Sequence, residues 1–338
     1  MTGTELNNLL ADLRRIRIAV LGDFALDLYW FIDPSASELS LETAKPTLPI
    51  SHQRVAPGGA GNVARNLVDL GTGSVHALGV VGPDPFGILM LQLLQSGGVL
   101  TEQMLTQHHE WHTVAFAKPI IDGTEHSRLD FGHFNSPSPE TIDRLLTRLE
   151  HLLPSLDAVI INQQLRRGLH SPQFRSRLAH LMARHQQHLF VVDCRNYSDS
   201  YLHAILKVNE SEALRLSGQP RTPGEAIPTE AVIQAAQALY RSRQRPVFVT
   251  RGERGCILCD ANHCDTVPAI PVAPPIDPVG AGDSFLAGLV TALAAGRSPI
   301  QAARFGSLVA AVTVKKLFQT GTATPEELRS LIHSLHAS

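Results

Sequence analysis

The feature that most constrains the fold of this chain is a repeated alternation of short apolar runs with helix-like segments. Three of the runs, at 16–21, 158–163 and 189–194, consist mainly of aliphatic side chains. Uninterrupted apolar runs of this length are typical of strands that are covered on both faces. The sequence therefore predicts an α/β fold with a mainly parallel central sheet and helices on both of its faces. Helices are expected between the runs, at 62–70, 85–96, 139–153, 171–185, 201–206 and 229–242.

Two stretches fall outside this alternation. Residues 24–55 lack helical periodicity and are rich in turn formers, and residues 112–131 contain two extended pieces around a turn at 122–123. The second pattern is typical of a β-hairpin. We expect the two stretches to join into a small separate sheet beside the main one. Since no low-complexity linker and no internal repeat divides the sequence, residues 1–338 are predicted to form a single domain.

The charge balance of the chain argues against nucleic acid and membranes as partners. The sequence has 29 Lys and Arg against 31 Asp and Glu, a formal net charge of −2. Such a balance provides neither a basic stripe for a phosphodiester backbone nor a polybasic patch for a membrane surface. The first residues lack the apolar core of a signal peptide, and no later apolar run has the length of a membrane span. We therefore expect a cytoplasmic protein that acts on a small molecule.

Three of the four cysteines lie close together. Cys256, Cys259 and Cys264, with His263 beside the last, superficially suggest a zinc site. The alternative is two strands joined by a turn at 261–262, in which residues three apart point to opposite faces. Because a second pair of zinc ligands is missing, we favour structural cysteines. Disulfides are not expected, since they are rare in the cytoplasm.

The clearest chemical signal is a small-residue turn before an apolar helix, formed by Gly280, Ala281, Gly282 and Asp283. Small residues let the backbone approach a ligand closely, and the first amides of a helix carry partial positive charge. Such amides stabilise the charge on a transferring phosphoryl group, and a carboxylate beside them accepts a proton from an attacking hydroxyl. The alternative is that Asp283 only caps the helix.

Other motifs follow predicted strands. A glycine-containing loop at 250–255 is suited to nucleotide phosphates, and Asn209 with Glu212 offers an amide and a carboxylate to hydrated magnesium. Gly22-Asp23 follows the first strand, and the glycines at 58–59 open a helix where a sugar can approach closely. Because ligands of open α/β sheets lie beyond the carboxyl ends of the strands, we expect these motifs to gather at one edge of the sheet.

Together these motifs resemble the ribokinase-like, or pfkB-type, carbohydrate kinases, over about residues 16–325. The segment PGGAGNVARNLVDLG at 57–71 is similar to the diglycine signature of that family, and DPVGAGD at 277–283 is similar to its C-terminal signature. The resemblance implies a ribokinase-like three-layer α/β/α fold with a small β-sheet lid, formed by about 27–53 and 112–131. It also implies ATP-dependent phosphorylation of a sugar hydroxyl with Mg²⁺, in an enzyme that is often a homodimer through the lid.

The resemblance also assigns roles to residues of this sequence. Asp283 is implied as the general base, with Gly280, Ala281 and Gly282 as the anion hole. Glu212 is implied near magnesium, through water, and Asp277 is a candidate ligand of K⁺. The other implied contacts are Asn209, Thr250, Gly252 and Gly255 for the nucleotide, and Asp23, Asp27, Gly58, Gly59 and Asn62 for the phosphoryl acceptor.

Within the family, the chain is most similar to the heptose 7-phosphate kinases, through GDFALDLYW at 22–30 and Arg-Leu-Asp at 128–130. An acceptor that already carries a phosphate requires cations, and Arg128 and Arg195 are the candidates, with solvation at the surface as the alternative. The segment 162–168 departs from the family pattern, so two other hypotheses stay open. One is a kinase for an unphosphorylated sugar or a nucleoside, and the other is a non-catalytic sensor, which would not need the base.

Overall fold

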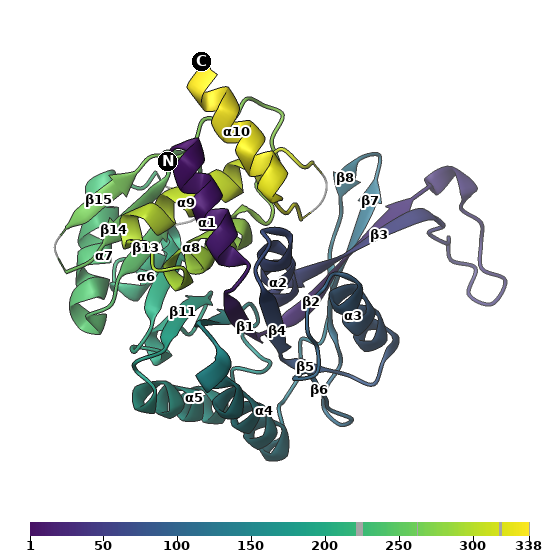
Figure 1. The fold of residues 1–338 in the computed structure, drawn as a ribbon. Helices are drawn as coiled ribbons and strands as arrows, with labels where there is room; N and C mark the ends of the chain where they lie inside the picture. Colours follow the sequence, from purple (N-terminus) through teal and green to yellow (C-terminus); the bar gives the residue numbers. More distant parts are fainter. Residues whose placement is uncertain (221–225, 262, 318–319, 338) are drawn as a thin grey trace.

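The structure, a computed structural model, describes residues 1–220, 226–261, 263–317 and 320–337. Within this described part, a main sheet contains eight strands in the order β15-β14-β13-β12-β11-β10-β1-β4 (Figure 1). The six strands from β13 to β4 are parallel to their neighbours, and β14 and β15 are added antiparallel. The strands are β1 (Arg17–Gly22), β4 (Ser74–Leu78), β10 (Ala158–Gln163), β11 (Leu189–Cys194), β12 (Ile205–Asn209), β13 (Val247–Thr250), β14 (Cys256–Cys259) and β15 (Cys264–Val267).

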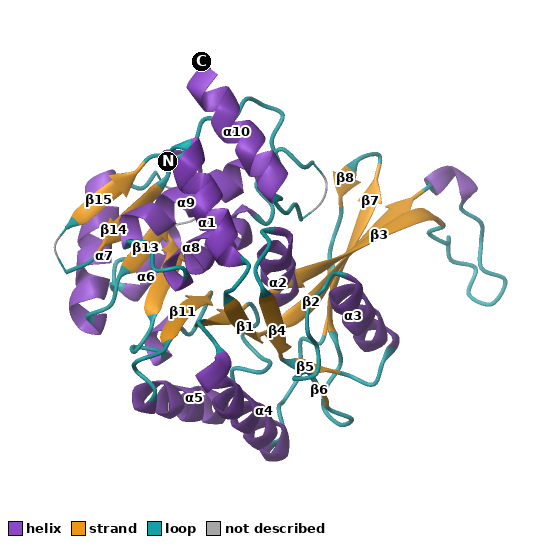
Figure 2. Ribbon diagram, in the orientation of Figure 1, coloured by secondary structure: helices purple, strands orange, loops and turns teal. Residues whose placement is uncertain are grey.

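Helices cover both faces of this sheet, so the predicted three-layer arrangement is confirmed (Figure 2). Each face has its own apolar core, because alternate residues of each strand point to opposite sides. One core includes residues of α1 (Gly3–Leu13), α2 (Ala60–Asp69), α8 (Ala281–Ala294), α9 (Pro299–Thr313) and α10 (Pro325–Ala337). The other includes residues of α4 (Pro139–Leu152), α5 (Pro172–Arg184), α6 (Glu210–Leu216) and α7 (Thr229–Arg243).

The register of the parallel strands aligns their carboxyl ends. Gly22 pairs with Asn162, and Asn162 in turn pairs with Asp193, so that the ends of β1, β10 and β11 lie in one row. Asn209 pairs with Thr250 at the ends of β12 and β13. The motifs that follow these strands are therefore brought to one edge of the sheet, as expected.

The two stretches outside the alternation form a second sheet, as predicted. Its strands are β2 (Phe24–Ile32), β3 (Ile50–Gly59), β7 (Val114–Ile121), β8 (Thr124–Glu125) and β9 (Leu129–Phe131). The sheet crosses beside α3 (Pro85–Ser96), and the loop between β2 and β3 projects away from the body of the molecule (Figure 1). A short pair, β5 (Val80–Val81) and β6 (Leu105–Thr106), follows β4, and Gly79 separates β4 from β5.

The predicted helix at 201–206 is wrong. Tyr201 is buried instead, with its hydroxyl 2.7 Å from Nδ1 of His170, and its carbonyl accepts a hydrogen bond from Arg243. These contacts fix the chain in a non-helical turn, and Ile205 begins the interior strand β12. The sheet position therefore overrides the local preference for a helix.

The expectation that the cysteines form no disulfide is also wrong for one pair. Cys259 and Cys264 lie opposite each other in the β14–β15 register and form a disulfide. The hairpin itself is confirmed, although Asn262 of the predicted turn lies outside the described residues. Cys256 and Cys259 do belong to opposite cores of the sheet, as the strand periodicity predicted.

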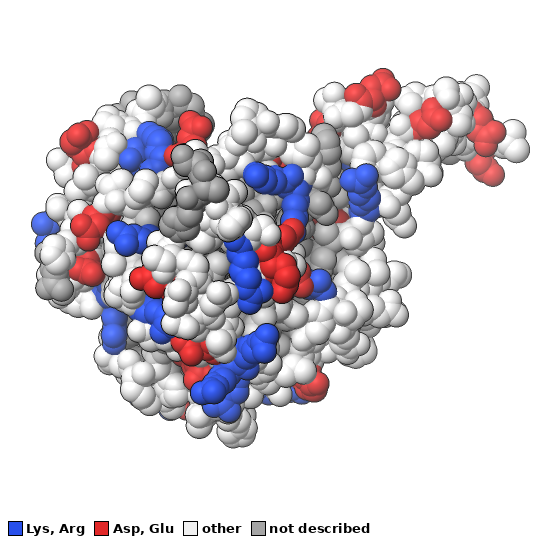
Figure 3. Space-filling model, turned by 45° about the horizontal axis from the view of Figure 1, so that its top comes forward, with Lys and Arg blue, Asp and Glu red and all other residues white. Residues whose placement is uncertain are grey.

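Basic and acidic side chains are interspersed on the face of the body that Figure 3 shows, in keeping with the near-balanced composition. A field of a single sign is therefore not seen over that face. Within the described residues, none of the helices combines the length and the apolar character that crossing a membrane requires.

Candidate active site

The first turn of α8 lies at the centre of the candidate site. Gly280 precedes the helix with φ of +80°, a left-handed conformation that favours glycine, and the helix begins at Ala281. The first amides of an α-helix have no carbonyl partner within the helix. The Ala281 amide donates to the carbonyl of Pro278 at 3.1 Å, so the amides of Gly282 and Asp283 are the ones that remain for a ligand. This geometry fits the anion hole that the sequence predicted, and it places Asp283 in the same turn.

Asp283 is held by a residue from a distant part of the chain. Nδ2 of Asn62 donates a hydrogen bond of 2.7 Å to Oδ2 of Asp283. Asn62 lies in the first turn of α2 and is almost fully buried. We predicted Asn62 as a contact of the acceptor, but in the structure its amide is committed to the proposed base.

A buried ion pair lies on the other side of the same turn. Nζ of Lys207 on β12 is 3.0 Å from Oδ2 of Asp193 at the end of β11, and both side chains are buried. A Cβ atom placed on Gly282 would be 3.2 Å from the Lys207 ammonium, which shows how close this cation lies to the helix start. Neither residue was predicted as a site residue from the sequence. Lys207 could have been identified from the sequence, because it is a charged residue inside the otherwise apolar run just before Asn209.

The surroundings of Asp283 change its acidity. Burial raises the pKa of Asp283 to about 6, and the negative charge of Asp193 acts in the same direction. The hydrogen bond from Asn62 and the charges of Lys207 and Arg195 oppose this increase. A carboxyl group with a pKa near 6 is ionised at neutral pH and still basic enough to accept a proton.

Asp23, which we predicted as an acceptor contact, is committed to the backbone. Its Oδ2 atom accepts hydrogen bonds from the amides of Gln164 and Leu165, at 2.9 and 3.0 Å. The carboxyl is buried, and burial raises the pKa of Asp23 to about 6. Asp23 thus holds the loop after β10, the segment in which the sequence departs from the family pattern.

Asp27 and the two glycines of the diglycine motif lie together. A Cβ atom on Gly58 would be 2.6 Å from Oδ2 of Asp27, so this position has room only for glycine while the carboxylate stays in place. Gly59 has φ of +55°, and a Cβ atom there would be 2.7 Å from the Asp23 carbonyl. Asp27 is paired with Lys118 of β7, at 2.7 Å, and this lysine was missed because nothing in its local sequence marks it.

The two arginines proposed from the sequence lie in different places. Arg128 forms a two-pronged ion pair with Asp130, with distances of 2.6 and 2.8 Å, and stacks over the Phe116 ring on the second sheet. Arg195 follows β11 and is exposed, and its charge lowers the pKa of Asp283. Arg195 is therefore the arginine that lies near the proposed base.

The motifs predicted to bind nucleotide and magnesium lie at the ends of β12 and β13. Asn209 caps α6, and its side chain and that of Glu212 each bond to the other's amide at 2.9 Å. The loop at 250–255 contains a short 3₁₀ turn, with Gly252 and Gly255 in left-handed conformations. Arg251 and Arg254 of this loop both pair with Glu210, so they stiffen the loop.

The predicted magnesium ligands fit a hydrated ion better than a directly bound one. One oxygen of Glu212, Oε2, accepts from the Asn209 amide, which leaves Oε1 as the remaining donor of this carboxylate. Within the described residues, there is no group of three or more His, Cys, Asp or Glu side chains that forms a metal cage. Mg²⁺ commonly keeps several waters and uses one or two carboxylates with the phosphates of its substrate, so this limited donor set is compatible with it.

Comparison with curated proteins gives relatives over nearly the whole chain. The bifunctional protein HldE of Coxiella burnetii (strain Dugway 5J108-111) is 30% identical over 330 residues, which is 96% of this chain and 65% of that protein. The bifunctional protein HldE of Shewanella sp. (strain MR-4) is 31% identical over 329 residues, with coverage of 95% and 64%. The chain thus spans about 65% of the length of these relatives.

Solved structures share the fold at low sequence identity. The ribokinase of Arabidopsis thaliana, complexed with ribose and ATP, has a TM-score of 0.73 at 20% identity, and covers 94% of this chain and 98% of that one. Phosphofructokinase-2 of Escherichia coli, in complex with potassium, has a TM-score of 0.72 at 21% identity, with coverage of 95% and 99%. The fold is therefore ribokinase-like.

The sequence also matches the model of the pfkB family of carbohydrate kinases over residues 17–327. This range includes both sheets and every motif described above. The chain belongs to the pfkB family of carbohydrate kinases.

Proposed function

We propose that this protein transfers the γ-phosphoryl group of ATP to a hydroxyl of a sugar phosphate similar to a heptose 7-phosphate, with Asp283 as the general base. The observation that carries the proposal is the first turn of α8. There a carboxylate with a pKa raised to about 6 lies beside the helix-start amides and the Lys207 ammonium. A base in the same turn as helix-start amides, with Lys207 of β12 beside it, matches the two requirements of phosphoryl transfer to an alcohol. Lys207 is paired with Asp193, so its attraction for a phosphate is weakened, and the amides carry the larger part of the argument.

The residues of this chain then have separate tasks. Asp283 takes the proton of the acceptor hydroxyl as that oxygen forms its bond to phosphorus and the bond between phosphorus and the ADP oxygen breaks. The amides at the start of α8 and Lys207 stabilise the charge on the phosphoryl oxygens. Asn209, Thr250 and the glycines at 252 and 255 are proposed to contact the nucleotide. Glu212 would hold hydrated Mg²⁺, which neutralises phosphate charge when it is bound.

The phosphorylated acceptor is supported by the similarity to the heptose 7-phosphate kinases and by Arg195. This arginine is exposed, follows β11, and lies close enough to Asp283 to affect its pKa. An exposed guanidinium pairs well with a phosphate through two parallel hydrogen bonds. We propose that Asp27, Gly58 and the second sheet cover the acceptor, and that closure of this sheet keeps water out.

A specific observation favours the second hypothesis, an unphosphorylated sugar or nucleoside as acceptor. Two cations beside the second sheet already have carboxylate partners, since Lys118 pairs with Asp27 and Arg128 pairs with Asp130, and Arg54 on β3 stacks over the Phe31 ring. A paired cation attracts a phosphate less strongly than an unpaired one does. Neutral hydroxyl groups, by contrast, can share hydrogen bonds with such pairs.

The experiment that tests the function is ADP release with MgATP across a panel of acceptors. The panel contains heptose 7-phosphate, fructose 1-phosphate, fructose 6-phosphate, ribose, fructose and adenosine, with Asp283→Asn as the control. Turnover on a phosphorylated sugar alone supports the proposal, and turnover on a neutral acceptor alone would replace the acceptor and keep the base. Binding without turnover across the panel would favour the sensor hypothesis.

We also propose a homodimer through the second sheet. The projecting loop between β2 and β3 and the start of β3 expose large apolar side chains at Leu39, Leu41, Leu48 and Ile50. A group of exposed apolar side chains on a projecting arm is typical of an interaction surface. Light scattering coupled to gel filtration tests this, and a Leu41→Asp variant that stayed in the same oligomeric state as the wild type would argue against this surface.

A further inference from the structure

Two asparagines one turn apart in α2 require an explanation. Asn62 and Asn66 are 2% and 0% exposed; Asn62 lies in the first turn of the helix and Asn66 in its interior. Asparagine is a poor residue for a helix interior, and burying its amide is costly unless the amide is hydrogen bonded. Oδ1 of Asn66 nevertheless has no partner among the described residues. The residue thus carries a cost that Leu or Ala at this position would avoid.

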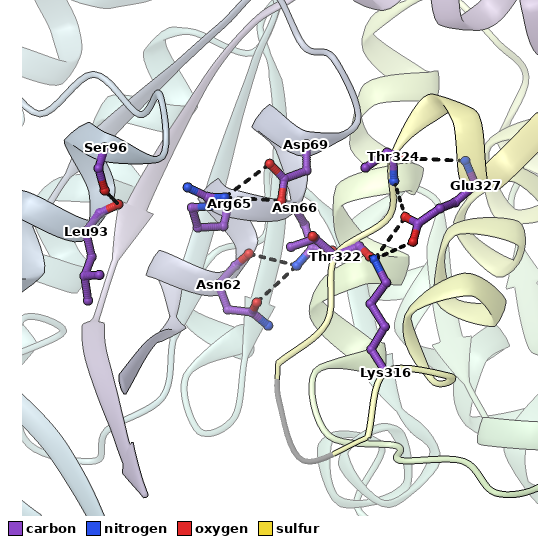
Figure 4. Close-up of polar contacts among 10 residues, drawn as sticks. All are labelled: Asn62, Arg65, Asn66, Asp69, Leu93, Ser96, Lys316, Thr322, Thr324 and Glu327. Carbon is purple, nitrogen blue, oxygen red and sulfur yellow. Dashed lines mark hydrogen bonds and ion pairs between the residues drawn. The ribbon is translucent and has the colours of Figure 1, made fainter. Parts of the chain in front are cut away.

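The side-chain amide of Asn66 donates hydrogen bonds through its nitrogen, and its oxygen accepts none from the described residues. Its Nδ2 atom donates to the main-chain oxygen of Asn62 at 2.9 Å and to Oδ1 of Asn62 at 3.1 Å (Figure 4). A main-chain carbonyl can only accept, so the amino group of Asn66, and not its oxygen, must face Asn62. The orientation of the Asn66 amide is therefore determined by the backbone.

This orientation determines that of the next amide. Because Asn66 presents a donor, the oxygen of the Asn62 side chain faces it, and the amino group of Asn62 points the other way. That amino group donates to Oδ2 of Asp283 at 2.7 Å. Without Asn66, the carboxylate still attracts the amino group of Asn62, but the Asn62 oxygen loses its donor, so the side chain is held at one end only and can rotate away from Asp283.

We infer that Asn66 is a positioning residue for Asp283: it fixes the Asn62 amide as a hydrogen-bond donor to one oxygen of the carboxylate. The other oxygen, Oδ1, then remains for the acceptor hydroxyl. The inference deepens the proposed function and rests on it for the role of Asp283. Asn66 itself lies one helical turn away from Asn62 and has no hydrogen bond to Asp283, so its effect passes through Asn62.

The pKa of Asp283 depends on the hydrogen bond from Asn62, so it can be used to detect whether that bond is in place. The groups that act on it are Asn62 from α2, Asp193 and Arg195 from β11 and the residues after it, and Lys207 from β12. The hydrogen bond from Asn62 lowers the pKa of Asp283, because it stabilises the ionised form. Loss of that donor therefore raises the pKa and moves the acid limb of activity to higher pH.

The test compares Asn66→Leu, which keeps the side-chain size and removes the donor, with Arg65→Ala. Arg65 is the neighbouring residue on α2, pairs with Asp69 at 3.3 Å, and has no hydrogen bond to Asn62 or Asn66, so it controls for general loosening of the helix. The carboxyl carbon of Asp283 is followed by ¹³C NMR titration in the full chain without ligands, and Asp283→Asn assigns the signal. Asn66→Ala is the second variant in case Asn66→Leu does not fold.

We expect Asn66→Leu to raise the pKa of Asp283 and to lower kcat at pH 7 about ten- to a hundredfold, the scale of one hydrogen bond to a charged group. Arg65→Ala should leave the titration unchanged. Adding Asn66→Leu to Asn62→Ala should have no further effect on the titration, because the two residues act in series.

An unchanged Asp283 titration in both Asn66 variants, or additive effects in the double variant, would overturn the inference. Failure of the proposed function is seen separately, since an active Asp283→Asn enzyme would remove the base and leave the NMR result standing.

Discussion

The turn after β1 and the first turn of α8 each place an aspartate at the carboxyl edge of the main sheet, and Asp23 is buried whereas Asp283 is partly buried. Burial raises the pKa of both Asp23 and Asp283 to about 6, so their acidity does not distinguish them. Their partners do. Asp23 accepts backbone amides of the loop after β10, whereas one oxygen of Asp283 takes a side-chain amide. A raised pKa is therefore common to both carboxyls, and their surroundings separate them: main-chain amides hold Asp23, whereas Asp283 lies at a helix start close to the Lys207 ammonium.

The largest effect is expected at Asp283. Asp283→Asn should lower turnover about a hundredfold or more, because an amide cannot accept the proton of the attacking hydroxyl. It should also make the fold more stable at pH 7, since the folded-state pKa of Asp283 is raised and the ionised carboxyl is destabilising above about pH 6. Steady-state kinetics and denaturant unfolding measure the two effects. Turnover close to that of the wild type would remove Asp283 from the mechanism.

The second prediction concerns Lys207, on the α8 side of the comparison. Removing this cation should lower turnover about ten- to a hundredfold, the scale for a group that stabilises the phosphoryl charge. Lys207→Met alone would leave Asp193 buried without its partner, so the Lys207→Met/Asp193→Asn double variant is the one to measure. Asp193→Asn alone is the matched control. Equal kcat values in the control and the double variant would assign Lys207 a structural role.

The pH dependence of kcat distinguishes Asp283 from Asp23. The base must be ionised, so kcat should be half-maximal near pH 6 and fall about tenfold for each pH unit below that value. Because Asp23 has a similar pKa, the wild-type profile cannot separate the two groups, and Asp23→Asn is the variant to use. We expect its acid limb to stay near pH 6. If kcat of Asp23→Asn no longer fell below pH 6, the group that must be ionised for activity would be Asp23.

Asp23 should matter more for stability than for chemistry. Asp23→Ala leaves the amides of Gln164 and Leu165 without their acceptor, which should lower the free energy of unfolding by about 2–4 kcal/mol. Turnover should fall by less than about tenfold, through disorder of the loop. Denaturant unfolding and kinetics at 15 °C check this. A loss of turnover as large as that of Asp283→Asn, with unchanged stability, would place Asp23 in the chemistry.

The smallest effect is expected at the arginines. Arg195→Ala should raise KM for a phosphorylated acceptor about three- to tenfold and leave KM for a neutral sugar unchanged, the range for one exposed charged contact. Arg128→Ala should have a weaker effect, because Arg128 is already paired with Asp130. Initial rates with paired phosphorylated and neutral sugars measure the ratio. A larger effect at Arg128 would mean that substrate breaks this pair.

The sequence was a good guide to the elements that depend on local pattern. β10 and β11 were predicted with the bounds that the structure has, because an uninterrupted apolar run bounded by polar residues has few alternatives as a buried strand. The helix at 201–206 failed because contacts from His170 and Arg243 hold that segment in another conformation. Lys118 and Lys207 were missed because their partners lie 91 and 14 positions away in the sequence.

Local patterns in the sequence were enough to predict the α/β architecture, the small-residue turn before α8 and the position of Asp283 in it. The architecture follows from the hydrophobic periodicity of the chain, and the turn follows from a run of small residues directly before an apolar helix. The polar groups that each carboxyl contacts depend on the packing of distant elements. Asn62 is 221 residues from Asp283, and Asp23 is 141 residues from the Gln164 amide. Hydrogen bonds are short and directional, so they depend on how distant elements pack, and local sequence does not specify that packing.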